Sequence, residues 1–109
     1  MTIHDYITKG GKNVIKEYLS SLPADEMKEG YAIRHDIILN GVEALKRLDT
    51  RQLRGKLWEI KFSNNRIMYV LADTESIFFF HACQKQKGKA EKFELETAIR
   101  RAREEGFSI

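Results

Sequence analysis

Basic side chains and one histidine recur from the middle of this 109-residue chain onward. They are Arg54, Lys56, Arg66, His81, Lys85, Lys87 and Lys89. Guanidinium and ammonium groups bind phosphate, and an imidazole exchanges protons near neutral pH. Residues 51–92 carry nine Lys and Arg against four Asp and Glu, a net charge of +5. This excess predicts a polyanionic partner such as RNA, and the alternative is a solvated basic face.

His81 ends an apolar run, Ile77–Cys83, which predicts a buried strand. Strict alternation places His81 on the same face as Phe79. An imidazole there could act as a general acid or base, and a buried, hydrogen-bonded histidine is the alternative. Lys85 and Lys87 follow two residues apart, so in an extended segment they point the same way.

The first half of the chain predicts a short strand and two helices that must position this chemistry. Ile3–Ile7 is expected to be the strand. Asn13 is expected to cap a helix over Val14–Leu22, whose apolar residues recur at intervals of three and four. Pro23 suits the first turn of the second helix, whose apolar positions continue to Leu48. Gly30 and Gly41 weaken this helix, and a break or kink is expected near Gly30.

The second half predicts three strands and a final helix. Trp58–Phe62, Arg66–Ala72 and Ile77–Cys83 are separated by short polar turns, which is typical of an antiparallel meander. Ala90–Glu105 has the apolar spacing of a helix. The expected fold is α+β: a small antiparallel sheet of the N-terminal strand and the meander, covered on one face by two N-terminal helices and a C-terminal helix. The length fits a single domain over residues 1–109.

Alternation within the meander also predicts which side chains are buried. Trp58 is expected to face the core, and Glu59 and Lys61 the solvent, where Lys61 forms a cross-strand salt bridge. Tyr69 is expected in the core, on the sheet face opposite to Arg66.

Composition excludes several other classes of protein. The single cysteine, Cys83, cannot form an internal disulfide or a site built on several thiolates, and it fits a reducing, cytoplasmic setting. The N-terminal residues include no apolar stretch typical of a secretory signal. The apolar run in the third meander strand is too short to span a bilayer, so no membrane is expected as a partner.

Three ordered segments resemble a known family. They are Leu53–Phe62 (LRGKLWEIKF), Asn65–Val70 (NRIMYV) and His81–Lys87 (HACQKQK), preceded by the Val14–Leu22 helix and followed by a charged helix. Together they resemble the RelE/ParE superfamily of toxins from type II toxin–antitoxin modules, in its HigB-like, phage-derived branch. The resemblance covers nearly the whole chain and implies a RelE-like fold.

The resemblance also implies a function. RelE-like and HigB-like toxins cut mRNA in the ribosomal A site, by attack of a 2′-hydroxyl on the adjacent phosphate, without a metal or cofactor. The implied partners are the ribosome, mRNA and a cognate antitoxin of the helix-turn-helix type, with operator DNA bound only through the antitoxin. The implied location is the cytoplasm.

Roles for individual residues follow from the same resemblance. The catalytic residues are expected to be Arg66 on the scissile phosphate, His81 as an acid or base and Lys85 at the rim. The RNA-binding residues are expected to be Arg54, Lys56, Lys87 and Lys89. Arg54, Arg66 and Lys85 are expected to converge on one concave spot. For Arg66 the alternative is a surface ion pair with Glu59 or Glu75.

Two other functions remain open at this point. ParE-like relatives share the fold and inhibit DNA gyrase without cutting RNA. A degenerate toxin would only bind its antitoxin. The chain departs from the family pattern at Cys83, where an aromatic residue is usual, and at Gly88–Ala90, which replaces a Thr-Pro pair. These departures affect the loop that carries Lys85.

Overall fold

The computed structural model describes all 109 residues and contains five strands and four helices. In chain order they are β1 (Thr2–Asp5), α1 (Val14–Ser20), α2 (Ala24–Asn40), α3 (Val42–Arg47), β2 (Asp49–Arg54), β3 (Leu57–Phe62), β4 (Asn65–Leu71), β5 (Ser76–Gln84) and α4 (Lys89–Glu104). The predicted α+β class is confirmed, including the three-strand meander β3–β5.

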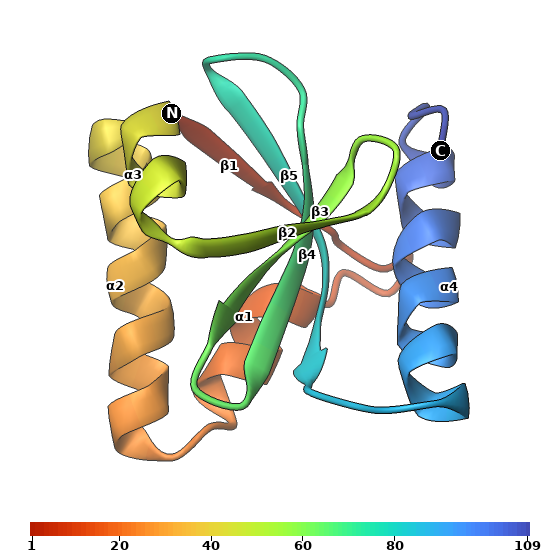
Figure 1. The fold of residues 1–109 in the computed structure, drawn as a ribbon, viewed down its shortest axis with the longest axis horizontal. Helices are drawn as coiled ribbons and strands as arrows, with labels where there is room; N and C mark the ends of the chain where they lie inside the picture. The colour runs from red at the N-terminus through yellow and green to blue at the C-terminus, as the bar shows by residue number, and fades with distance from the viewer.

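The strands form one open sheet in the order β1-β5-β4-β3-β2 (Figure 1). The strands β2 to β5 pair antiparallel with their neighbours in sequence, whereas β1 pairs in parallel with β5. The sequence does not predict β2, because Asp49–Arg54 contains one large apolar residue, Leu53. Its edge position explains this composition, since an edge strand needs only one buried side.

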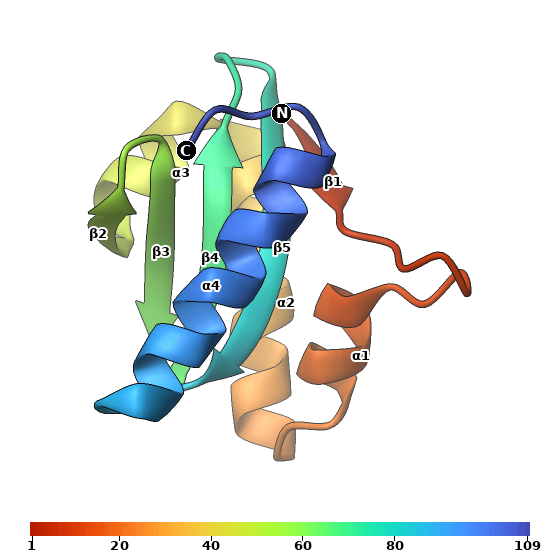
Figure 2. The same cartoon turned by 90° about the vertical axis from the view of Figure 1, so that its right-hand side faces the viewer.

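Helices cover both faces of the sheet, so the prediction of a single covered face is wrong. The helices α1, α2 and α3 lie on one face and α4 crosses the other (Figures 1 and 2). The physical reason is that β3, β4 and β5 carry apolar side chains on both faces, as Leu57 and Ile60 do on β3. A sheet of this kind must be covered twice to remove that surface from water.

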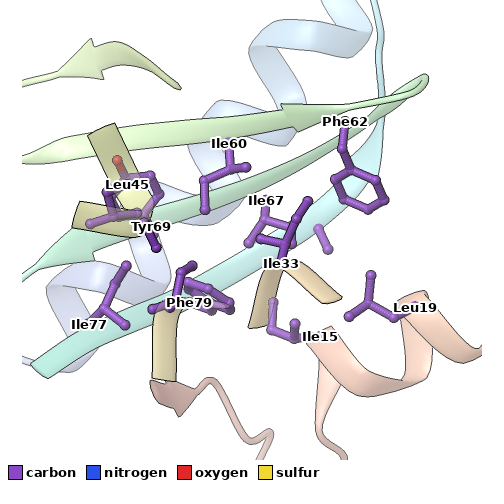
Figure 3. Close-up of a cluster of buried hydrophobic side chains, with 13 residues drawn as sticks. Ile15, Leu19, Ile33, Leu45, Ile60, Phe62, Ile67, Tyr69, Ile77 and Phe79 are labelled. Atoms are coloured by element: carbon purple, nitrogen blue, oxygen red, sulfur yellow. The ribbon is translucent and has the colours of Figure 1, made fainter. Parts of the chain in front are cut away.

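Two apolar cores result. The larger one, between the sheet and α1–α3, includes Ile15, Ile33, Ile67 and Phe79 (Figure 3). The smaller one lies beneath α4 and is built by Leu57, Met68, Val70, Phe80, Cys83, Ala98, Ile99 and Ala102. Tyr69 is in the larger core, as predicted.

Trp58 is the exception among the predicted core residues. Its side chain is 37% exposed. It lies in a hollow of about 500 Å³ with Leu45 and Lys56, where the cover provided by α3 ends. The prediction that Trp58 faces the core is therefore wrong, although the alternation of β3 is correct.

Local signals explain the ends of the N-terminal helices. Asn13 caps α1 as predicted, because its Oδ1 accepts hydrogen bonds from the backbone N–H groups of Ile15 (3.1 Å) and Lys16 (2.9 Å). Gly30 does not kink α2. The helix breaks instead at Gly41, whose φ of 58° and ψ of −130° suit glycine.

Close packing, and not backbone geometry, requires a glycine at the position of Gly30. A Cβ atom at this position would lie 2.7 Å from Leu19 Cδ2 and 3.3 Å from Phe62 Cζ. The glycine therefore lets α2 approach α1 and β3 closely. None of the four helices combines the length and apolar character that crossing a bilayer requires.

Candidate active site

The predicted site residues divide into two groups at opposite ends of the strands. Arg66 is the second residue of β4 and is paired in register with Cys83 of β5. Lys85 follows directly after β5, and its backbone N–H donates to Asn64 O at 2.8 Å. His81 is two residues before Cys83, so Arg66, His81 and Lys85 share one end of the β4–β5 pair.

Arg54 and Lys56 lie at the other end. Arg54 pairs with Leu57, which pairs with Val70, four residues along β4 from Arg66. At about 3.3 Å per residue this is a separation of roughly 13 Å. Lys56 lines the hollow beside Trp58 on the face covered by α3. The expected convergence of Arg54, Arg66 and Lys85 on one spot is therefore not present.

A β-bulge changes the orientation of His81. In the β4–β5 register Met68 pairs with His81 and Tyr69 with Phe79, which leaves Phe80 as an extra residue. Because one extra residue reverses the alternation, His81 faces α4 and not the side on which Phe79 is buried. The prediction that His81 and Phe79 share a face is wrong for this reason.

The His81 imidazole is hydrogen-bonded at both nitrogens. Nε2 contacts a carboxylate oxygen of Glu94, and Arg101 Nη1 lies 3.0 Å from Nδ1. An arginine has only donors, so Nδ1 must offer its lone pair. Nε2 then carries the proton that is shared with Glu94. The network thus fixes a neutral imidazole with one defined tautomer.

Burial is the largest cause of a lowered pKa for His81, and the carboxylate of Glu94 opposes it. Arg101 and Arg100 lower the pKa further. A neutral imidazole with its carboxylate on one nitrogen and a lone pair on the other has the arrangement of a general base. His81 is therefore the residue of this site best suited to accept a proton.

Arg101 is the hydrogen-bond donor to the lone pair on His81 Nδ1. Its Nη1 also donates to Phe80 O at 3.0 Å, and its guanidinium lies 4.8 Å from the ring centre of Tyr6. Two surface hollows, of about 520 and 310 Å³, meet at the His81–Arg101 pair. Phe93 and Arg100 border the larger hollow. A ligand in either hollow can therefore reach both the imidazole and a guanidinium.

The sequence reading missed Glu94 and Arg101. They are seven residues apart, which is two turns of a helix, so they project from the same side of α4. The spacing alone indicates a shared side. What they contact depends on the bulge in β5, which turns His81 toward α4.

Arg66 is buried and paired with acids. It is 5% exposed. Its Nε lies 3.5 Å from Glu59 Oε1 and its Nη1 lies 3.1 Å from Glu91 Oε1. Glu59 was one of the two pairing partners considered from the sequence, and Glu75 makes no such contact. The pairing is internal to the molecule and not on its surface.

Glu59 departs from the expected polar face of β3. Its side chain is fully buried beneath α4, where Arg51 Nε lies 3.1 Å from Oε2. Lys61, its expected companion, makes no ion pair within 4.0 Å, so the predicted cross-strand salt bridge is wrong. The reason is that α4 covers this face of the sheet and buries Glu59 together with Arg51 and Arg66.

His81, Cys83 and Glu94 are of the types that bind metal ions, and their ligand atoms lie within 4.8 Å of one another. A metal bound at Nε2 needs the proton on Nδ1, but Nδ1 faces the donor Arg101. Burial also raises the pKa of the Cys83 thiol to about 12. The arrangement therefore favours a hydrogen-bonded cluster over a metal centre.

The loop lysines remain free of ion pairs. Lys85, Lys87 and Lys89 are exposed and have no acidic partner within 4.0 Å. They lie beside the end of the sheet that holds Arg66. The site thus combines a buried arginine, a neutral histidine oriented by a carboxylate, and exposed ammonium groups.

Comparison with known proteins places this geometry in a family. The sequence matches none of the curated proteins with which it was compared. It does match the family described as Phage derived protein Gp49-like (DUF891), over residues 17–103. That range begins within α1 and contains α2 to β5 and nearly all of α4, so it includes every candidate site residue. The chain therefore belongs to the Phage derived protein Gp49-like family, which is a family of RelE-like toxins.

Proposed function

We propose that this protein is the toxin of a type II toxin–antitoxin module and cuts mRNA on the ribosome. One observation carries the proposal: the imidazole of His81, hydrogen-bonded to Glu94 and Arg101 at the meeting point of two surface hollows. Membership of a RelE-like toxin family supports the same reading. The proposed reaction is a transesterification within the RNA, for which the side chains of this site supply acid, base and positive charge.

The 2′-hydroxyl of the RNA is the nucleophile. A phosphate in the hollow offers Arg101 a charged acceptor that is stronger than the imidazole lone pair. As Arg101 turns to the phosphate, His81 Nδ1 becomes free to take the 2′-proton. Glu94 stabilises the imidazolium that forms, as the carboxylate does in a serine protease triad.

The other groups act on the phosphate and the leaving oxygen. The bond from O2′ to phosphorus forms, and the bond from phosphorus to O5′ breaks. Arg101 stabilises the negative charge on the non-bridging oxygens. Arg66 lines neither hollow and is paired with Glu59 and Glu91, so it adds positive charge from the edge of the site. The Lys85 ammonium supplies the proton that O5′ needs in order to leave. The products are a 2′,3′-cyclic phosphate and a 5′-hydroxyl.

The remaining basic residues extend the interface. Lys87 and Lys89 are beside the site and attract the RNA backbone. Arg54 and Lys56 lie roughly 13 Å along the strands, so we assign them to a different stretch of backbone, such as ribosomal RNA. A helix-turn-helix antitoxin silences the toxin, and operator DNA is bound only through that antitoxin.

Cleavage of a translated reporter mRNA tests the proposal. Primer extension after addition of the wild-type protein should show breaks that depend on translation. His81→Gln should lower the cleavage rate by at least about 100-fold, the usual contribution of a general base. His35→Gln is the matched control, because His35 is exposed on α2. Full activity of His81→Gln at equal expression would contradict the assigned role.

The same assay separates the alternatives. Intact mRNA together with gyrase cleavage complexes and a DNA-damage response would indicate a ParE-like inhibitor. Intact mRNA, no toxicity and retained antitoxin binding would indicate a binding module. The burial of Arg66 between Glu59 and Glu91 is the observation that favours this last alternative.

A further inference from the structure

Arg51 and Arg66 bridge the same two carboxylates beneath the start of α4. Arg51 Nε lies 3.1 Å from Glu59 Oε2, and Arg51 Nη2 lies 3.5 Å from Glu91 Oε1. Arg66 makes the complementary contacts, with Glu59 Oε1 at 3.5 Å and Glu91 Oε1 at 3.1 Å. The guanidinium groups of Arg51 on β2 and Arg66 on β4 therefore both face Oε1 of Glu91.

The two carboxylates differ in how firmly they are held. Glu59 is on β3 and has no exposed surface, so it is a fixed counterion. Glu91 is in the first turn of α4, and its side chain is 39% exposed. A hydrogen bond from Arg66 is the main cause of its lowered pKa. Glu91 is thus anionic at neutral pH, and its partly exposed side chain can leave the two arginines for solvent.

The first turn of α4 carries no buried apolar residue. The buried residues of this helix are Ala98, Ile99 and Ala102, which all lie in its second half. The helix begins after Gly88, and no side chain caps its N-terminus. Segments with few buried apolar contacts open at low free energy. Glu91 can therefore withdraw while the rest of α4 stays in place.

A carboxylate between two guanidinium groups at a helix N-terminus occupies a position that suits a phosphate. A phosphodiester has two non-bridging oxygens, where Glu91 offers one oxygen to both arginines. Arg66 reaches Glu91 through Nη1, which a phosphate oxygen in the place of Glu91 would accept from, while its buried Nε faces Glu59 at 3.5 Å. Arg51 is 48% exposed and leaves a path from solvent.

We propose that Arg51 and Arg66 form a phosphate-binding cradle, which Glu91 fills when no nucleic acid is bound. A backbone phosphate of single-stranded RNA replaces Glu91 on binding, and Glu59 stays beneath as the counterion. The choice of RNA as the ligand of this cradle rests on the proposed function. The cradle adds Arg51 as a second phosphate-binding residue. It also makes Glu91 a side chain that competes with the substrate for the two arginines.

Binding of a short RNA methylated at every 2′-oxygen tests the cradle, because such RNA cannot be cut by its own hydroxyl groups. Fluorescence anisotropy should show that Glu91→Gln binds at least about threefold more tightly than wild type, the scale of one exposed ion pair. Glu43→Gln is the matched control: it removes the same charge from an exposed helix position, and its ion pair is with Lys46 on α3 at 3.1 Å. It should tighten binding by less.

The double variant identifies the cradle itself. Glu91→Gln in an Arg51→Gln background should show a smaller gain than in the wild-type background, because only Arg66 is then left for Glu91 to block. Glu91→Asp keeps the charge but withdraws the carboxylate by one methylene, and should give an intermediate gain even if Glu91→Gln unfolds. Equal effects of Glu91→Gln and Glu43→Gln, or a gain of the same size with and without Arg51, would overturn the proposal.

The failure of this proposal can be told from the failure of the nuclease proposal. If the wild type does not cut mRNA but Glu91→Gln binds RNA more tightly, the cradle stands and the chemistry does not. If the wild type cuts mRNA but Glu91→Gln changes nothing, the chemistry stands and the cradle does not. An equal gain for single-stranded DNA supports the cradle, since it recognises phosphate and not the sugar.

Discussion

The two nitrogens of His81 have opposite partners, and this decides the charge of the residue. Arg101 requires a lone pair at Nδ1, and Glu94 accepts the proton at Nε2. A charged imidazole would direct an N–H toward a guanidinium that is already a donor. The folded protein therefore binds the His81 proton less readily than the unfolded chain does.

This difference predicts the pH dependence of stability. The pKa of His81 lies below 6.5 in the folded state, chiefly because of burial. Where the unfolded chain binds more protons, stability rises with pH. The contribution is therefore complete above about pH 7 and is lost as the pH falls through 6.5 toward the lower folded pKa.

Urea unfolding of wild type and His81→Gln at several pH values between about 5 and 7.5 measures the effect. The wild type should lose stability toward acid more steeply than His81→Gln, which lacks the titrating group. His35→Gln should keep the wild-type slope. Parallel curves for wild type and His81→Gln would show that the imidazole is not held neutral.

Residue types were easier to predict from the sequence than residue contacts. The basic residues and His81 stand out by type, but Glu59 and Arg101 do not, because charged residues on a strand or helix are usually solvated. Only the second covered face buries Glu59 and brings Arg101 to His81. That contact depends on a bulge that alternation in the sequence does not reveal.

At the scale of elements, one buried ion pair joins β1 to α2. Arg34 Nη1 and Nη2 donate to the two carboxylate oxygens of Asp5 at 2.7 and 2.8 Å. The side chains are only 9% and 7% exposed. Asn13 Nδ2 also donates to Asp5 at 3.0 Å, so the start of α1 is tied to the same carboxylate.

Asp5→Ala should destabilise the protein by about 3–5 kcal/mol, because it leaves the Arg34 charge buried without a partner. Arg47→Ala is the comparison. It removes an exposed pair with Asp36, in which the Arg47 side chain is 58% exposed, and should change the free energy of unfolding by about 0–1 kcal/mol. Chemical denaturation measures both. Similar small effects would mean that the Asp5–Arg34 pair does not hold β1 in place.

Elements with strong periodicity were predictable from the sequence, and weakly patterned ones were not. The strands β3 to β5 and the helices α1 and α4 follow from alternation, apolar spacing and the Asn13 cap. The edge strand β2 has one large apolar residue and gives no such signal. The helix α2 ends at Gly41 and not at Gly30. Gly30 is needed for the close contact of α2 with Leu19, which is a feature of tertiary packing that the sequence does not reveal.

At the scale of the whole molecule, the basic residues are divided by the meander itself. Arg54 and Lys56 flank the turn between β2 and β3, and Arg66 follows the turn between β3 and β4. Consecutive turns of a meander lie at opposite ends of the sheet, so the length of β3 must separate them. The predicted meander already implied this separation, although the residues appear clustered along the chain.

Salt dependence of RNA binding should distinguish the two groups. For single strands, each phosphate contact contributes about 0.7 to the slope of log affinity against log salt. Lys85→Gln should reduce the slope for a short methylated RNA by about that amount. Arg54→Gln should leave it unchanged, because Arg54 lies roughly 13 Å away along the strands and is assigned to a different stretch of RNA. Equal reductions would place both residues on one RNA path.

The chemistry of the RNA ends tests the central claim most directly. Fragments made by the wild-type protein on translated mRNA should carry a 2′,3′-cyclic phosphate on the upstream piece and a 5′-hydroxyl on the downstream piece. These ends follow from attack by the neighbouring 2′-hydroxyl with His81 as the base. Fragments with a 3′-hydroxyl and a 5′-phosphate, or mRNA that stays intact while the cells stop growing, would contradict the account.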